Sequence, residues 1–588
     1  MCGIAGVMTA SGGAVAETIL DRLEAALAHR GPDGAGRFHG TGVGLVHRRL
    51  AIIDLTTGDQ PLHAPGGAVL VANGEIYNYL ELKAALPDIA FATRSDCEPP
   101  LHLYQREETG FARSLRGMYA IALFDPATDH LLLARDRFGI KPLYYAETPT
   151  GFAFASEPQA LIRAGWIGAE LNPAARNELL QLQFTTGRDT IFAGIERVLP
   201  GETLVVGQGR VVERQRLAAL PEAGPADWSE EEALARLETA LMESVELHQR
   251  ADVPYGLFLS GGIDSSVILA AMARLNAEPV RAFTAGFSGT DVHDERAAAR
   301  HLAKAVGADH VEVDFAERDF WQLLPRIAAA LDDPAADYAV LPTWKLGQRA
   351  AEAGLKVVLC GEGGDELFAG YGRYRAAIRP WWIGGRAMRA KGILDRPGLL
   401  REPLTGWRDG ILAAESRAAD FGRSRLQAAQ AVDCADWLPH DLLLKLDRCL
   451  MAHGVEGRTP LLDPAVAEVA LRLPDRLKVR DGRGKYLLRR WLARALPQAD
   501  PFGRKRGFTV PVGHWIAARG EALWPLVARQ EGVARICHEE AVRRVFSAGG
   551  KHEAFAAWTL LFYALWHQHH ILGLAVADDV FAALETRI

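Results

Sequence analysis

Short apolar runs separated by turn residues fill the first part of the chain. Residues 69–72 and 119–124 are examples, and such runs bounded by Gly, Pro or Asp are typical of β-strands. The pattern changes at 217–228, where the chain becomes rich in Ala, Pro and Glu. Directly afterwards, Ser229 and Glu232 have the Ser-x-x-Glu spacing of a capping box, which predicts the start of a helix.

Beyond this point helical stretches alternate with short apolar segments, a pattern that indicates βαβ units and a parallel sheet. We expect strands at 255–259, 280–287, 310–313 and 356–360. A chain of 588 residues also exceeds the ~250–300 residues at which one core stops growing. We therefore expect two domains, at 2–215 and 232–588, with a linker at 216–231.

Composition narrows the class of protein. The chain is 49% hydrophobic and 24% charged, and 66 Lys and Arg residues face 73 Asp and Glu, so no global charge attracts nucleic acid or an acidic membrane. The N-terminus lacks the pattern of a signal peptide, and six scattered cysteines without a CxxC pair favour a reducing cytoplasm.

Two stretches raise the question of a membrane or RNA surface. Residues 554–577 carry no formal charge, but His567, Gln568, His569 and His570 interrupt them, so we expect a buried C-terminal helix. Residues 373–401 are rich in Arg and contain Trp381 and Trp382, and here we expect a solvated helix face with packed Trp side chains.

Candidate chemistry begins at Cys2. If Met1 is removed, the α-amine and the thiol belong to one residue, and the amine is then an intramolecular base for a nucleophile. Four segments follow in order: His-Arg-Gly-Pro-Asp at 29–33, His47 to Asp54, Asn-Gly-Glu-Ile-Tyr-Asn at 73–78 and Ser-Asp-Cys-Glu at 95–98. With 134–145 and 155–157, they closely resemble the class II glutamine amidotransferase domain.

That resemblance implies an α/β N-terminal-nucleophile hydrolase, in which antiparallel sheets are layered with helices. Glutamine requires a cation for its α-carboxylate, anions for its α-ammonium and donors for the oxyanion. The resemblance implies Cys2 as nucleophile, an oxyanion hole formed by Asn73 and Gly74, and a glutamine site formed by Arg49, Leu50, Ala51, Ile52, Ile53, Asn73, Gly74, Glu75 and Asp96. Pro99 and Pro100 depart from the family pattern, so the next helix is expected to begin differently.

A second site is indicated by Ser-Gly-Gly-Ile-Asp-Ser at 260–265, which follows a predicted strand and precedes a helix. Small residues let backbone N–H groups approach an anion, and a helix N-terminus favours negative charge. The segment resembles the pyrophosphate loop of ATP pyrophosphatases, and the Walker-type P-loop is absent. ATP is therefore expected to yield AMP and pyrophosphate. A second acidic loop at 360–371 follows a second predicted strand and contains Asp365, which with Asp264 is suited to hold Mg²⁺.

Further segments at 447–463, 484–489 and 505–508 resemble the asparagine synthetase domain, so the resemblance covers residues 2 to about 570. It implies a parallel-sheet, ATP pyrophosphatase-like domain with a helical extension. The ATP and pyrophosphate site is then formed by Leu259, Ser260, Gly261, Gly262, Asp264, Ser265, Ala285, Cys360 and Gly361. Glu362 is expected to act on ammonia or the intermediate, and Lys505 to stabilise the adenylate and pyrophosphate.

The resemblance implies amidation of aspartate to asparagine through β-aspartyl-AMP, with ammonia from glutamine and with ATP and Mg²⁺ as cofactors. The products are glutamate, AMP and pyrophosphate, the partners are these small molecules, and a homodimer is compatible. One alternative keeps both sites but amidates a peptide or a sugar acid. A regulatory protein with dead sites is disfavoured, because Cys2, Asp264 and Asp365 are all present, and a bare glutaminase is disfavoured by the intact pyrophosphate loop. No spacing singles out the residues that bind aspartate.

Overall fold

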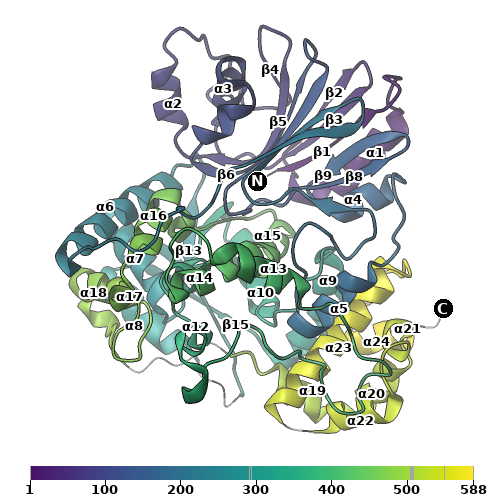
Figure 1. Ribbon diagram of the computed structural model, residues 1–588, viewed down its shortest axis with the longest axis vertical. Helices are drawn as coiled ribbons and strands as arrows, with labels where there is room; N and C mark the ends of the chain where they lie inside the picture. Colours follow the sequence, from purple (N-terminus) through teal and green to yellow (C-terminus); the bar gives the residue numbers. More distant parts are fainter. Residues whose placement is uncertain (1, 291, 293, 504–508, 549, 587–588) are drawn as a thin grey trace.

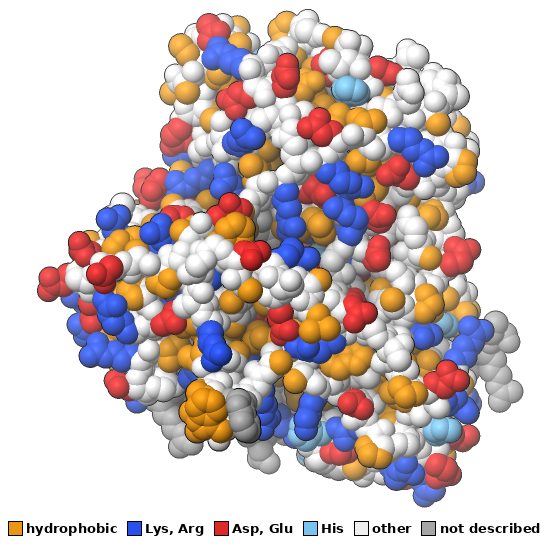
Figure 2. Space-filling model, viewed as in Figure 1, with side chains coloured by type: hydrophobic (Ala, Val, Ile, Leu, Met, Phe, Trp, Pro, Cys, Tyr) orange, Lys and Arg blue, Asp and Glu red, His pale blue; other side chains and the backbone are white. Residues whose placement is uncertain are grey.

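The computed structural model describes residues 2–586, except 291, 293, 504–508 and 549. Two parts lie one above the other in Figure 1, the first built on antiparallel sheets and the second on a parallel sheet with many helices. This is the predicted fold class. Acidic and basic side chains are interspersed over the face shown in Figure 2, in line with the balanced composition.

The first part contains two six-stranded antiparallel sheets. In spatial order, one consists of β10 (Glu196–Arg197), β8 (Tyr144–Thr148), β9 (Gly151–Ala155), β1 (Gly3–Thr9), β3 (Val43–Arg49) and β2 (Gly34–Gly40). The other consists of β12 (Arg210–Arg216), β11 (Glu202–Gly207), β7 (His130–Arg135), β6 (Gly117–Asp125), β5 (Val69–Ile76) and β4 (Leu62–His63).

Side-chain alternation along these strands builds the layers. On β5, Val69 and Val71 pack against Ile4 and Leu45 of the facing sheet, whereas Leu70 and Ala72 belong to a separate core cluster on the outer face. That outer face is covered by α2 (Tyr79–Ala85) and α3 (Pro99–Glu107), and the other sheet by α1 (Glu17–Ala26) and α4 (Pro158–Arg163). The result is a four-layer arrangement of helix, sheet, sheet and helix.

The second part is organised by a five-stranded parallel sheet. Its spatial order is β15 (Asp309–Asp314), β14 (Arg281–Gly286), β13 (Tyr255–Phe258), β16 (Val357–Leu359) and β17 (Glu456–Arg458). One face packs on α6 (Glu230–His248), α7 (Ile263–Leu275), α8 (Arg296–Val306) and α18 (Tyr486–Ala495), and the other on α10 (Val340–Glu352) and α15 (Leu443–Met451).

A helical extension completes the second part. It consists of α9 (Glu317–Ala330), α19 (Val512–Ala518), α20 (Gly520–Ala528), α21 (Glu531–Ala534), α22 (Glu539–Ser547), α23 (Lys551–His570) and α24 (Val580–Glu585). The helix α23 is almost entirely buried, as the uncharged stretch predicts, and it packs against α9 and α19. Across the described residues, we find no helix that is both long and apolar enough to cross a membrane.

Most of the predicted strands are confirmed within one or two residues at each end. The capping box is also confirmed, since the Ser229 hydroxyl accepts a hydrogen bond from the Glu232 amide and Glu232 accepts one from the Ser229 amide. The expectation for Trp382 is wrong: its side chain is 69% exposed rather than packed. Pro99 and Pro100 begin α3, and the loss of their N–H groups costs little there because the first turn of a helix has no intrahelical acceptors for these groups.

Candidate active sites

Cys2 lies directly before β1, beside Asn73 on β5 of the facing sheet. The Cys2 amide donates a hydrogen bond to Asn73 Oδ1 at 2.9 Å, and both residues are buried. Asn73 Nδ2 has no hydrogen-bond partner among the described residues. A buried donor without an acceptor is costly, so the amide group is set to receive an oxygen from a ligand. Burial raises the pKa of the Cys2 thiol, and a backbone hydrogen bond from Leu50 opposes that rise.

Gly74, next along β5, is required by a close approach between strands. A Cβ at this position would lie 2.2 Å from the carbonyl oxygen of Met118 on β6. Because side chains alternate along a strand, Asn73 and Glu75 share one face of β5, and position 74 points to the other face. A side chain at position 74 would therefore clash with the backbone of β6.

Arg49, at the end of β3, forms an ion pair with an exposed acid, Asp59. Its guanidinium donates to Asp59 at 2.7 Å, and the Asp59 side chain is 81% exposed. A substrate carboxylate could take the place of Asp59 at this cation. Beyond Arg49, Leu50 and Ile52 are buried, the Ala51 amide donates to Asp33 at 2.8 Å, and Ile53 lines a cavity of about 510 Å³.

Glu75 and Asp96 are both buried anions, but they have different partners. Asp96 accepts a hydrogen bond from the Ile76 amide at 2.8 Å, and burial raises its pKa. Glu75 lies 3.2 Å from Arg458 on β17, in the second part of the molecule. Burial raises the pKa of Glu75 despite this guanidinium. Glu75 thus reaches the junction between the two parts.

The second group of residues surrounds the carboxyl end of β13. Gly262 is the N-cap of α7 and supplies no side-chain cap, which leaves the first backbone donors of this helix available for an anion. Ser265 fixes the loop, since its hydroxyl accepts from the Ser260 amide at 3.1 Å and donates to the Ser260 carbonyl at 3.0 Å. Leu259, directly after β13, and Ala285, on the adjacent strand β14, are both buried, and Leu259 N donates to Phe283 O at 2.8 Å.

The loop after β16 approaches this anion site through its glycines. A Cβ on Gly361 would lie 3.0 Å from Asp264 Cβ, and one on Gly364 would lie 2.4 Å from Asp264 Cγ. Cys360 is buried behind the loop, and its amide donates to the Arg458 carbonyl at 2.8 Å. The close approach brings Asp365 toward Asp264.

Lys485 lies between these two carboxylates. Its ammonium donates to Asp264 and lies 2.6 Å from Asp365 Oδ1, and both acids raise its pKa against the effect of burial. Two carboxylates, from the first turns of two separate helices, thus converge on one positive charge. Carboxylate oxygens are the donors that a hard divalent cation prefers. The residues fit a Mg²⁺ ion bound with nucleotide phosphates. Lys485 belongs to the segment 484–489 that resembles the asparagine synthetase domain.

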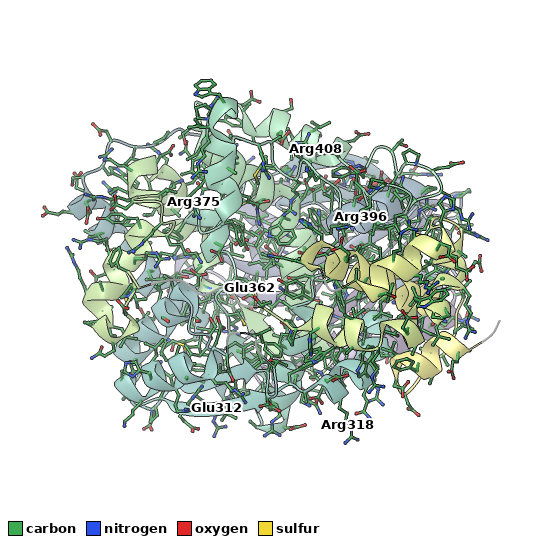
Figure 3. All side chains as sticks on the ribbon, turned by 90° about the horizontal axis from the view of Figure 1, so that it is seen from below. Glu312, Arg318, Glu362, Arg375, Arg396 and Arg408 are labelled. Carbon is green, nitrogen blue, oxygen red and sulfur yellow. The ribbon has the colours of Figure 1, made fainter. Side chains whose placement is uncertain are left out.

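Glu362 is half-buried and lies near the centre of the molecule in Figure 3. Burial raises the pKa of its carboxyl, Lys445 opposes this, and Asp264 adds to it. Lys505 lies outside the described residues, so its predicted role stays a prediction. Glu362, which is predicted to act in the reaction, thus interacts with Asp264 beside the anion loop and with Lys445 on α15.

Buried charges join the two parts where the sites face each other. Arg30 donates to the Cys2 carbonyl at 3.2 Å and, through its two terminal nitrogens, to Asp447 of α15 at 2.8 and 3.0 Å. Asp447 begins the segment 447–463 of the second part of the chain. No spacing in the sequence indicates that it contacts Arg30 of the first part. Removing one partner from such a buried pair typically costs about 3–5 kcal/mol.

The antiparallel part with its Cys2 site and the parallel sheet with its anion loop define a two-domain amidotransferase. Residues 1–216 match the glutamine amidotransferase domain family, and residues 236–568 match the asparagine synthase family. The chain belongs to the asparagine synthase family, and with its amidotransferase domain it is a glutamine-dependent ligase.

Individual relatives span nearly the whole chain. Glutamine-hydrolyzing asparagine synthetase 1 of Bacillus subtilis is 31% identical over 97% of this chain and 97% of its own length. Glutamine-hydrolyzing asparagine synthetase B of Escherichia coli is 28% identical over 90% of this chain and 86% of its own length. Amidase chyE of Penicillium rubens is 33% identical over 83% of this chain and 86% of its own length.

Proposed function

We propose that this enzyme converts aspartate to asparagine, using ammonia from glutamine and releasing AMP and pyrophosphate from ATP. The observation that carries the proposal is that buried charges on α15 connect the two sites of one chain. Arg30 contacts both the Cys2 carbonyl and α15, and α15 also carries Lys445 beside Glu362. The domain division at 2–215, 216–231 and 232–588 is part of the proposal.

In the first half-reaction, the Cys2 thiolate attacks the side-chain amide carbon of glutamine. The α-amine exposed by loss of Met1 takes the thiol proton and delivers it to the leaving ammonia. The free Nδ2 of Asn73 and the backbone at Gly74 stabilise the oxyanion, while Arg49 holds the α-carboxylate and Asp96 and Glu75 balance the α-ammonium. Water then releases glutamate from the thioester.

In the second half-reaction, the β-carboxylate of aspartate attacks the α-phosphorus of ATP, and pyrophosphate leaves. The loop from Ser260 to Ser265 and the start of α7 hold the leaving phosphates. Asp264 and Asp365 would hold Mg²⁺, which neutralises phosphate charge when bound. Ammonia then attacks the acyl carbon of the β-aspartyl-AMP, AMP leaves, and Glu362 accepts a proton from the ammonia-derived nitrogen.

A second candidate keeps this chemistry and changes the acceptor to a peptide or sugar acid. The similarity to a relative named an amidase, chyE, supports testing this second candidate. Pyrophosphate release with MgATP and ammonia distinguishes the two. We expect aspartate to drive release well above succinate or glutamate at equal concentration. A carboxylated peptide or sugar that exceeded aspartate would replace the proposed acceptor.

A further inference from the structure

Asp441 is a fully buried carboxylate whose oxygens have no hydrogen-bond donor among the described residues. It lies near the end of η4 (Asp433–Leu442), a π-helical segment that continues directly into α15. A buried carboxylate without donors costs several kcal/mol unless a partner arrives. Wide π-turns of this kind are found frequently at functional sites. Asp441 is therefore set to receive a positively charged ligand group.

Lys445 lies four residues further along the same continuous helix and is almost completely buried. Its ammonium donates to Asp337 Oδ2 at 2.9 Å. Burial lowers the pKa of Lys445, but three carboxylates raise it above its ordinary value: those of Asp337, Asp441 and Glu362. These four side chains therefore form one cluster around a single ammonium group, which can make three hydrogen bonds.

This cluster is continuous with the reaction centre. The groups that act on the charge of Glu362 are Lys445, Asp264 and Asp337. Asp264 belongs to the anion loop, so Glu362 lies between the phosphate-binding end and the cluster on η4 and α15. An acceptor with its reacting carboxylate at the nucleotide would therefore extend past Glu362 toward Lys445 and Asp441.

We infer that Lys445, Asp337 and Asp441 bind the amino-acid end of the acceptor, an inference that rests on the proposed function. Lys445 binds the α-carboxylate with a donor that Asp337 leaves available. Asp441, together with Asp337, accepts hydrogen bonds from the α-ammonium. The acceptor class is thus an α-amino acid with a second carboxylate on a short side chain, and a dicarboxylate without the ammonium is rejected.

Replacing Asp441 tests this assignment through specificity rather than through activity alone. With MgATP and ammonia, we expect Asp441→Asn to raise the KM for aspartate roughly 10- to 100-fold, because a hydrogen bond to a charged group is lost. The preference for aspartate over succinate should fall by the same factor. Lys445→Met should instead reduce the preference for aspartate over 3-aminopropanoate, which lacks the α-carboxylate.

Asp436→Asn is the matched control, because Asp436 is a buried acid of the same segment whose carboxylate accepts a hydrogen bond from the Gly187 amide at 2.7 Å. It should leave the acceptor preferences unchanged. If Asp441→Asn does not fold, Asp337→Asn provides the same test at a less buried position and should lose the same preference for aspartate over succinate.

Two outcomes separate this inference from the proposed function. Wild-type enzyme that turns over aspartate, with a variant whose aspartate KM and succinate discrimination are unchanged, would overturn the inference alone. Wild-type enzyme that releases no pyrophosphate with aspartate would overturn both. Hydrolysis of glutamine and the KM for MgATP should stay at wild-type values in Asp441→Asn.

Discussion

The side-chain amide of Asn73 is suited to two functions in the proposed reaction. Its oxygen is held by the Cys2 amide, which fixes the orientation of the group, and its nitrogen then points away with no acceptor among the described residues. This hydrogen bond joins the residue before β1 to the interior of β5 in the facing sheet. A preorganised donor of this kind typically contributes about 10²–10³ in rate to oxyanion stabilisation.

The nucleophile is tested by Cys2→Ala. We expect glutamine-dependent synthesis to fall about 10⁴-fold or more, because the other residues of the site cannot act without the nucleophile. Ammonia-dependent synthesis should remain close to wild type, because the anion loop is untouched. Both activities are measured as amide formed with MgATP and aspartate.

Cys97→Ala is the control for this prediction. Cys97 is a second buried thiol near the same strand, 3.9 Å from the Gly74 carbonyl oxygen, and burial raises its pKa well above the ordinary value. It should retain glutamine use. A Cys2→Ala enzyme that still used glutamine as its donor would assign the nucleophile elsewhere.

Local spacing could identify residues that lie within one motif, such as those of 73–75 and 260–265. It could not identify the cluster around Asp441, because Asp337 and Glu362 come from segments far from Asp441 and Lys445 in the chain. Arg30 and Asp447 illustrate the same limit, since their contact joins residues 417 positions apart. From the sequence alone, charged residues are expected at the surface. Only the fold shows that Arg30, Asp441 and Asp447 are buried.

At the scale of elements, strands that are apolar on both faces were predictable and those with buried charges were not. Strands β13, β14 and β16 lie where apolar runs predict them, and β15, with the sequence Asp-His-Val-Glu-Val-Asp, lies where the short segment 310–313 predicts it. In contrast, β17 consists of Glu456, Gly457 and Arg458, and no hydrophobic pattern marks it. Its two charged side chains are fully buried and paired at 2.6 Å, and neighbouring cations lower the pKa of Glu456 to about 2. The π-helical geometry of η4 likewise leaves no sequence signature.

A short helix of the second domain gives a test of stability against pH. Lys478 ends α17 (Asp475–Lys478) and is fully buried, donating to Gln430 at 2.8 Å and to the Leu471 carbonyl at 3.0 Å. Burial lowers its pKa to about 7. Between this value and its ordinary value, the unfolded chain binds a proton that the folded chain does not. Stability should therefore rise with pH in this window, by at most about 1.4 kcal/mol per pH unit.

Lys478→Met removes this titration. From pH 7 to pH 9, we expect the thermal unfolding midpoint of the wild type to rise relative to that of Lys478→Met. Lys304→Met, at an exposed position on α8, should follow the wild type. Equal pH dependence in the wild type and Lys478→Met would show that this lysine does not titrate in the window.

At the scale of the whole molecule, the two domains meet through buried ion pairs rather than through an apolar seam alone. Arg30 with Asp447 and Arg458 with Glu75 cross the junction close to the amidotransferase residues. Arg116 crosses it as well, pairing with Asp463 at 2.8 Å. Such pairs require good geometry to compensate for desolvation, which favours one relative placement of the domains. A fixed placement is what transfer of ammonia from one site to the other requires.

The balance of products in a single reaction tests the central claim most directly. Purified enzyme is supplied with glutamine, aspartate and MgATP, and glutamate, asparagine, AMP, ADP and pyrophosphate are measured over time. We expect asparagine, AMP and pyrophosphate to appear in equal amounts and glutamate to form with them. All of these products except glutamate should require aspartate. ADP with phosphate as the nucleotide products, or pyrophosphate release that does not depend on aspartate, would contradict the central claim.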